Sequence, residues 1–156
     1  MTSTSVSHHC LTQSDEYALR AMTYIAMKPQ VELISGGEIA EATGIPPHYS
    51  SKVLRRLVVA GLLVSSRGRT GGFRLALPAD CIRFLDILLA TDFKPDSNHC
   101  AFGWPRCDRD HPCPLHPAYS ELKRLFLKWS ATVTLADVFE DKSALERFIG
   151  RAPESP

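Results

Sequence analysis

Apolar residues recur at helical spacing near the start of the chain. Between Ser14 and Met27 they fall three, four and seven positions apart, which predicts an amphipathic helix that ends before Pro29. Ser14 is the expected N-cap, and the acidic residues Asp15 and Glu16 favour the positive end of the helix dipole. We expect the apolar face of this helix to form one side of the core.

Two shorter helices follow, with a tight turn between them. Ser35 and Glu38 have the spacing of a capping box and open a short helix that stops at Gly44. The next helix begins near Pro47, carries an apolar stripe and ends at Gly61, a residue typical of the position after a helix. Two short helices joined by a few residues are the signature of a helix-turn-helix.

Two strands are predicted next, over Leu62–Val64 and Phe73–Leu77. Between them lie three glycines, which permit positive φ angles at the tip of a hairpin, and the outward-facing Arg67 and Arg69. A basic hairpin after a helix-turn-helix is the winged-helix arrangement. The expected fold class is therefore mainly α with a small β-wing.

In the second half of the chain, the spacing of apolar residues predicts two further helices separated by an irregular loop. One runs from Cys81 to Thr91, with Cys81 expected as a buried thiol, and a long one runs from Pro117 to Ala131. The long helix has a bulky stripe of Leu122, Leu125, Phe126 and Trp129. So bulky a stripe favours burial against a second subunit, and packing on the chain's own first helix is the alternative.

Composition narrows the class of protein. The chain has 156 residues, of which 44% are hydrophobic, so it can bury a core. No apolar run is long enough to span a membrane, and residues 1–10 lack the apolar core of a signal peptide, so we expect a cytoplasmic protein. In that compartment five cysteines favour metal ligands or core residues over disulfides.

Basic residues are concentrated in one part of the chain. Residues 46–79 carry six Lys and Arg side chains and no Asp or Glu, although the whole chain has a net charge of only +1. Such a stretch suits a polyanion-binding surface, and a solvated helix face is the alternative. In a helix-turn-helix the N-terminal residues of the second helix reach base edges, and later cations suit phosphates. The expected DNA-binding residues are Tyr49, Ser50, Ser51, Lys52, Arg55 and Arg56 of that helix, with Arg67 and Arg69 of the hairpin.

Three cysteines gather in the irregular loop. Cys100, Cys107 and Cys113 are separated by six and five residues, which disfavours the CxxC pair of a zinc knuckle. Three thiolates in a loop rich in proline and glycine can wrap an iron–sulfur cluster, with a fourth position filled by a histidine (His99, His111 or His116) or by a carboxylate. Zinc and a metal-free loop stay open as alternatives. The chain lacks the signals of an enzyme, such as a phosphate-binding glycine loop or a nucleophile elbow.

These features together resemble a known family. The motifs are Tyr17-Ala18-Leu19-Arg20, Glu38-Ile39-Ala40, Val53-Leu54-Arg55-Arg56-Leu57, Gly71-Gly72-Phe73-Arg74-Leu75, the three-cysteine loop and Thr134-Leu135-Ala136-Asp137-Val138. Over about residues 11–139 the chain resembles the Rrf-type regulators, the IscR/NsrR family of winged-helix, iron–sulfur-sensing transcription factors. The resemblance implies a homodimer formed by the long helix, double-stranded promoter DNA as partner, and a [4Fe-4S] or [2Fe-2S] cluster on Cys100, Cys107 and Cys113 that senses nitric oxide, redox state or cluster and iron supply.

The resemblance leaves the fourth ligand open. Members that sense cluster supply resemble this chain at His116, and members that sense nitric oxide use a first-helix carboxylate from the partner subunit, where Glu16 stands here. We favour Glu16, with His116 as the alternative. The expected division of the chain is a DNA-binding domain over residues 11–80 and a cluster-binding and dimerisation segment over 81–139, with peripheral ends at 1–10 and 140–156.

Overall fold

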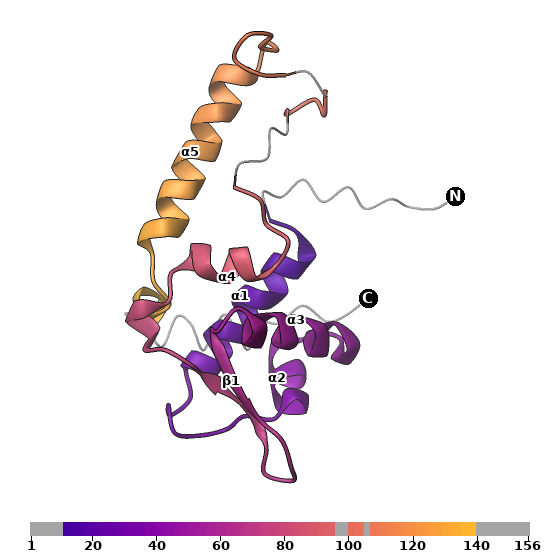
Figure 1. Cartoon of the computed structure of the whole chain (residues 1–156), viewed down its shortest axis with the longest axis vertical. Helices are drawn as coiled ribbons and strands as arrows, with labels where there is room; N and C mark the ends of the chain where they lie inside the picture. Colours follow the sequence, from indigo (N-terminus) through magenta and orange to yellow (C-terminus); the bar gives the residue numbers. More distant parts are fainter. Residues whose placement is uncertain (1–10, 96–99, 105–106, 140–156) are drawn as a thin grey trace, which may run out of the picture.

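The computed structural model describes residues 11–95, 100–104 and 107–139. Four helices and a β-hairpin form a head, and one long helix projects from it (Figure 1). The elements in chain order are α1 (Gln13–Ala26), α2 (Gly36–Thr43), α3 (Pro47–Val59), β1 (Leu63–Ser66), β2 (Gly72–Leu75), the 3-10 turn η1 (Ala79–Cys81), α4 (Phe84–Ala90), α5 (His116–Thr132) and the 3-10 turn η2 (Ala136–Phe139).

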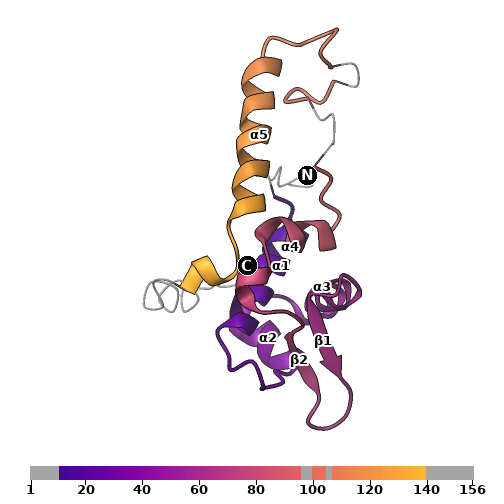
Figure 2. The same cartoon turned by 60° about the vertical axis from the view of Figure 1, so that its left-hand side comes forward.

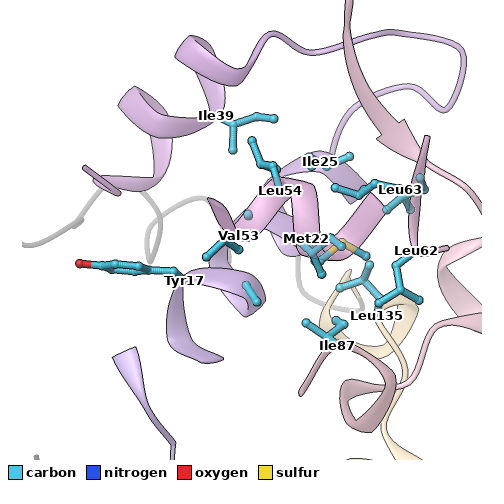
Figure 3. Close-up of a cluster of buried hydrophobic side chains, with 14 of the residues drawn as sticks. Tyr17, Met22, Ile25, Ile39, Val53, Leu54, Leu62, Leu63, Ile87 and Leu135 are labelled. Atoms are coloured by element: carbon cyan, nitrogen blue, oxygen red, sulfur yellow. The ribbon is translucent and has the colours of Figure 1, made fainter. Parts of the chain in front are cut away.

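Helix α1 forms the centre of the head. Its apolar stripe, including Met22 and Ile25, is buried against α2, α3, α4 and β2. In the close-up, Leu54 of α3 and Ile87 of α4 belong to the same cluster of side chains, together with Leu135 from beyond α5 (Figure 3). Burial of each such side chain contributes about 1.5–3 kcal/mol, so this cluster is the main source of the head's stability.

The N-terminus of α1 differs from the expectation by two residues. Thr12, not Ser14, is the N-cap: its hydroxyl accepts a hydrogen bond from the Asp15 N–H at 3.3 Å, and the Asp15 carboxylate accepts from the Thr12 N–H at 2.7 Å. Asp15 is completely buried and also accepts a hydrogen bond from the Thr91 hydroxyl at the end of α4. Asp15 therefore completes the capping box of α1 and also fixes the end of α4 against α1.

The two helices of the helix-turn-helix begin and end at the capping, glycine and proline residues that the sequence predicts. The Ser35 hydroxyl accepts from the Glu38 N–H at 3.1 Å at the start of α2. Gly44 ends α2 with φ of +66°, a left-handed conformation that favours glycine. Pro47 occupies the first turn of α3, where its missing N–H costs no helical hydrogen bond.

Strands β1 and β2 form the wing, an antiparallel hairpin in which Leu63 pairs with Leu75. The strands are shifted slightly from the expected ranges, toward the loop in β1 and away from Leu77 in β2. Gly72 has a specific packing role, because a Cβ atom there would lie 2.5 Å from the carbonyl oxygen of Ile34. That close approach lets the Ile34 backbone pair with Phe73 and adds the segment before α2 to the wing.

Helix α4 is shorter than expected. Residues Ala79–Cys81 form a 3-10 turn, and the helix starts only at Phe84. Cys81 is exposed, so the expectation of a buried thiol there was wrong. The apolar periodicity belongs to Ile82, Ile87 and Leu88, which are buried, while Cys81 lies on the turn before them.

Helix α5 projects away from the head, as both views show (Figures 1 and 2). The C-terminal part of α5 packs on α4. There the ring of Trp129 contacts the ring of Phe84 edge-on, with 5.4 Å between the ring centroids. Leu122 and Leu125 remain 50% and 49% exposed in the single chain. Within the described residues no helix is long and apolar enough to cross a bilayer.

Candidate metal centre and nucleic-acid interface

The three loop cysteines converge at the start of α5. Their sulfur atoms all lie within 4.8 Å of one another, and the Cys100 and Cys113 sulfurs are 3.5 Å apart. All three residues are buried and form a cluster separate from the main core. The chain therefore brings together thiols that its sequence separates by as many as thirteen positions.

His116 joins this group through the turn that opens α5. The His116 N–H donates to the Cys113 carbonyl at 2.9 Å, which closes one turn around Pro114 and Leu115. The imidazole Nδ1 then lies 3.1 Å from the Cys107 sulfur. The four side chains surround a cavity of about 20 Å³. Of the two residues proposed as a fourth ligand, His116 is the one that a single chain places beside the cysteines.

The electrostatic environment differs among the thiols. Burial raises the pKa of Cys100, but hydrogen bonds from the backbone N–H groups of Phe102 and Trp104 and from the neighbouring thiols outweigh it and lower the pKa to about 7. The Phe102 N–H lies 3.4 Å from the Cys100 sulfur. A backbone hydrogen bond from Cys113 lowers the pKa of Cys107, but burial and the adjacent thiols raise it overall. Cys100 is thus more readily deprotonated than Cys107, and metal binding requires the thiolate form.

Sequence reasoning missed three residues that line the cavity from α5. Tyr119, Ser120 and Lys123 follow His116 by three, four and seven positions, so all four lie on one face of the helix. The Lys123 ammonium lies 5.3 Å from the centroid of the Tyr119 ring. The helical spacing from His116 was the signal in the sequence that could have identified them.

Other candidate ligands lie elsewhere. Glu16 is on α1 in the head and pairs with Arg20 at 3.8 Å, and α1 lies far from the outer end of α5 (Figure 1). His111 is exposed in the loop, 3.4 Å from Asp108. His99 lies outside the described residues. Within one chain, neither Glu16 nor His111 belongs to the cysteine group.

Helix α3 presents part of its predicted interface to solvent. Tyr49, Ser51, Lys52 and Arg55 are exposed, and the Tyr49 ring stacks at an angle on His48, 4.1 Å between centroids. Ser50 differs from the expectation, because it is 2% exposed and its hydroxyl has no hydrogen-bond partner among the described residues. Ser50 therefore faces the core and not the solvent side of α3.

Arg56 connects α3 to the segment after α4. Its guanidinium pairs with the Asp92 carboxylate at 2.9 Å. Asp92 follows Thr91, whose hydroxyl donates a hydrogen bond to the Asp15 carboxylate of α1. The start of the segment that leads to Cys100 is therefore tied to both α1 and the basic helix.

Arg67 and Arg69 flank Gly68 in the loop of the wing, and both are exposed. Gly68 has φ of +111°, which a residue with a side chain rarely adopts, so the hairpin can turn tightly between the two arginines. The wing extends from the end of the head opposite to the outer end of α5 (Figure 2). The basic surface and the cysteine group thus lie at opposite ends of the molecule.

Comparison with known proteins gives one family. The model of the Rrf2 family, described as iron-dependent transcriptional regulators, matches residues 11–141. The chain is also similar to the solved structure of CymR, the global cysteine regulator of B. subtilis, at 21% identity and a TM-score of 0.69 over 82% of this chain and 94% of that one. T. potens IscR is similar at 23% identity and a TM-score of 0.67, over 86% of this chain and 89% of that one.

A third structure, Staphylococcus aureus CymR, has 24% identity and a TM-score of 0.66, over 83% of this chain and 97% of that one. At these identities the likenesses concern the fold. They confirm the expected architecture, mainly α with a small β-wing.

Proposed function

The chain belongs to the Rrf2 family of transcriptional regulators, and from this premise we propose that its binding to promoter DNA is controlled by an iron–sulfur cluster held by Cys100, Cys107 and Cys113. The observation that carries the proposal is the convergence of three buried thiols within 4.8 Å at the start of α5. Proteins rarely gather buried cysteines outside disulfides and core packing unless the sulfurs bind a metal.

The donor set fits such a group. Thiolates are the usual ligands of iron–sulfur clusters, and an imidazole replaces thiolate in some of them. We propose His116 as the fourth ligand, because its Nδ1 lies 3.1 Å from the Cys107 sulfur, and we keep Glu16 of a partner subunit as the alternative. The cluster, of [4Fe-4S] or [2Fe-2S] type, supplies a redox-sensitive and nitric-oxide-sensitive centre when bound. Lys123, which lines the same cavity, offers a positive charge toward thiolate ligands.

The DNA-binding surface is proposed as the exposed side of α3 and the wing. Tyr49 and Ser51 at the start of α3 are placed to reach base edges, whereas Lys52 and Arg55 one turn later suit phosphates. Arg67 and Arg69 extend the basic surface to the minor groove or its flanking phosphates. Ser50 is left out because it is buried.

A homodimer completes the proposed regulator. Leu122 and Leu125 leave an apolar stripe on α5 half exposed, and a second copy of α5 would cover it. Two heads would then present two copies of α3 to a two-fold symmetric site on DNA.

The connection between the metal site and the DNA-binding surface runs through the segment after α4. Thr91 bonds Asp15 of α1, and Asp92 pairs with Arg56 of α3. A change in the loop that begins beyond Asp92 therefore acts on the helix that contacts DNA. A coupling of about 1–3 kcal/mol would change DNA affinity about 5- to 150-fold.

The test is anaerobic purification and reconstitution, with visible absorption, iron and acid-labile sulfide analysis and native mass, followed by binding to promoter DNA. We expect a coloured protein whose DNA affinity changes when the cluster is removed. Cys107→Ala should lose both the colour and the response, while Cys81→Ala, which alters an exposed cysteine outside the group, should keep both. A wild-type protein without iron and sulfide after reconstitution contradicts the proposal and leaves the alternative, a zinc-stabilised or metal-free winged-helix protein.

A further inference from the structure

We infer that Cys100, Cys107, Cys113 and His116 also form a closed site for a single tetrahedral Zn²⁺ ion, which the cluster-free protein binds. This goes beyond control by a cluster, because it assigns the same side chains a second, redox-inert occupant. It does not require that a cluster assemble.

The distances between the donor atoms carry the inference. Around one tetrahedral zinc, with Zn–S of about 2.3 Å and Zn–N of about 2.0 Å, two sulfurs lie about 3.8 Å apart and a sulfur and a nitrogen about 3.5 Å apart. Here the Cys100 and Cys113 sulfurs are 3.5 Å apart, and Cys107 Sγ and His116 Nδ1 are 3.1 Å apart. No sulfur is more than 4.8 Å from another. Changes of about 1 Å or less in these separations bring the three sulfurs to the spacing expected around one ion, and the Cys107–His116 pair is within about 0.4 Å of it.

The same distances bear on the size of the occupant. In a [4Fe-4S] cluster each protein ligand binds a different iron, so its thiolates stand farther apart than thiolates on one metal, whereas in a [2Fe-2S] cluster two ligands share each iron. The cavity between the four residues measures about 20 Å³. A water-sized occupant needs about 10–15 Å³ by this kind of measure, so the cavity as described has room for a single ion. The arrangement described is therefore compact enough for one metal ion.

The local fold makes the fourth donor part of a rigid element. Cys113 and His116 are separated by two residues, within the turn closed by the hydrogen bond from the His116 N–H to the Cys113 carbonyl. Because His116 is the first residue of α5, its position is fixed by the helix. Three cysteines and one histidine are a common ligand set of structural zinc sites, in which no position is left open. An ion in this site would hold the loop against α5.

The single-ion state has a regulatory consequence. Zn²⁺ has no redox chemistry in proteins, so a zinc-loaded chain would not respond to redox signals, and assembly of a cluster would first require loss of the ion. Zinc and cluster would therefore compete for one site.

The experiment is a titration of cluster-free, reduced full-length protein with Co²⁺ under anaerobic conditions, since Co²⁺ reports tetrahedral thiolate ligation by visible absorption. We expect one Co²⁺ per chain, with intense bands that added Zn²⁺ abolishes by displacement. His116→Ala should weaken Co²⁺ binding at least tenfold and change the spectrum. His116→Cys should restore tight binding through a fourth thiolate. His111→Ala, which removes an exposed imidazole from the same loop, is the matched control and should bind like the wild type.

Binding of less than one Co²⁺ per chain, an octahedral spectrum, or equal affinity in the wild type and His116→Ala overturns the inference. Circular dichroism of His116→Ala shows whether the head is folded, and the rescue by His116→Cys separates ligation from a purely structural effect. Reconstitution with iron and sulfide is run in parallel. A protein that assembles a cluster but binds no Co²⁺ contradicts only the single-ion site, and one that binds Co²⁺ but assembles no cluster contradicts only the proposed function.

Discussion

Removal of the two wing arginines tests the proposed DNA surface most directly. Arg67 and Arg69 are exposed at the loop of the wing, and neither forms an ion pair with any of the residues that the structure describes. Their charges are therefore available to phosphates, and replacing both by alanine should leave the fold of the head unchanged.

The magnitude follows from counterion release. Each phosphate contact contributes about 0.9 to the slope of log K against log salt on duplex DNA. Two arginines in each protomer make four contacts in a dimer, so the double variant should have a slope shallower by about 3.6. Between about 50 and 200 mM salt the wild type should then lose about 150-fold more affinity than the variant.

Fluorescence anisotropy with a labelled duplex measures this slope, and because the term does not depend on base sequence, any duplex serves. The double variant Lys94→Ala, Lys128→Ala is the control, since it removes two exposed cations from the segment after α4 and from α5. We expect the control to keep the wild-type slope. Equal slopes for the wing variant and the wild type would refute the placement of the wing on DNA.

Three further variants test the packing of the head. Leu54→Ala should lower the free energy of unfolding by about 2–5 kcal/mol in urea denaturation, because Leu54 is 1% exposed in the core. Thr91→Val should cost about 1–3 kcal/mol, because it removes a donor from the buried Asp15 carboxylate. Asp86→Asn should cost about 1 kcal/mol at neutral pH, because the Asp86 carboxylate accepts hydrogen bonds from the Arg83 side chain and N–H. The hydrogen bonds from Arg83 hold the pKa of Asp86 below its ordinary value, so this last difference should be complete above about pH 5 and vanish in thermal unfolding as the pH falls through the lowered pKa.

Each variant has a matched comparison. Leu77→Ala removes an exposed leucine and should cost far less than Leu54→Ala. Thr132→Val alters an exposed threonine at the end of α5 and should be nearly neutral. If either control cost as much as its buried counterpart, burial would not be the cause. If the cost of Asp86→Asn were the same at neutral pH and well below pH 4, the hydrogen bonds to Arg83 would not explain it.

The helix-turn-helix could be predicted because its signals are local. Gly44 and Pro47 limit the backbone itself, and each stands at the helix end that its conformation favours. The start of α1 could not be fixed in the same way. Thr12 and Ser14 can both cap a helix, and the choice depends on Asp15, whose carboxylate is held by Thr91 from a distant part of the chain.

The burial of two side chains was predicted wrongly, for different reasons. Ser50 stands three, four and seven positions before Val53, Leu54 and Leu57, so the apolar stripe of α3 itself places it on the buried side, and its residue type misled the prediction. Cys81 lies in a one-turn element, whose buried side is decided by its neighbours in space rather than by its own pattern. Residue type singled out the three cysteines and favoured Glu16 over His116 as the fourth ligand. The contact of Cys107 with His116 depends on a loop whose path no periodicity predicts.

Within the head, the segment just before α4 lies beside the segment just after α5. The Phe84 N–H donates to the Val133 carbonyl at 3.0 Å, and the Leu135 N–H donates to the Ile82 carbonyl at 2.7 Å. These bonds close the base of an excursion that contains every described cysteine of the metal group. A change in the length or sequence of the loop at the far end leaves these two backbone hydrogen bonds unaltered. We therefore expect the ligand set of the loop to vary in evolution while the DNA-binding head keeps its structure.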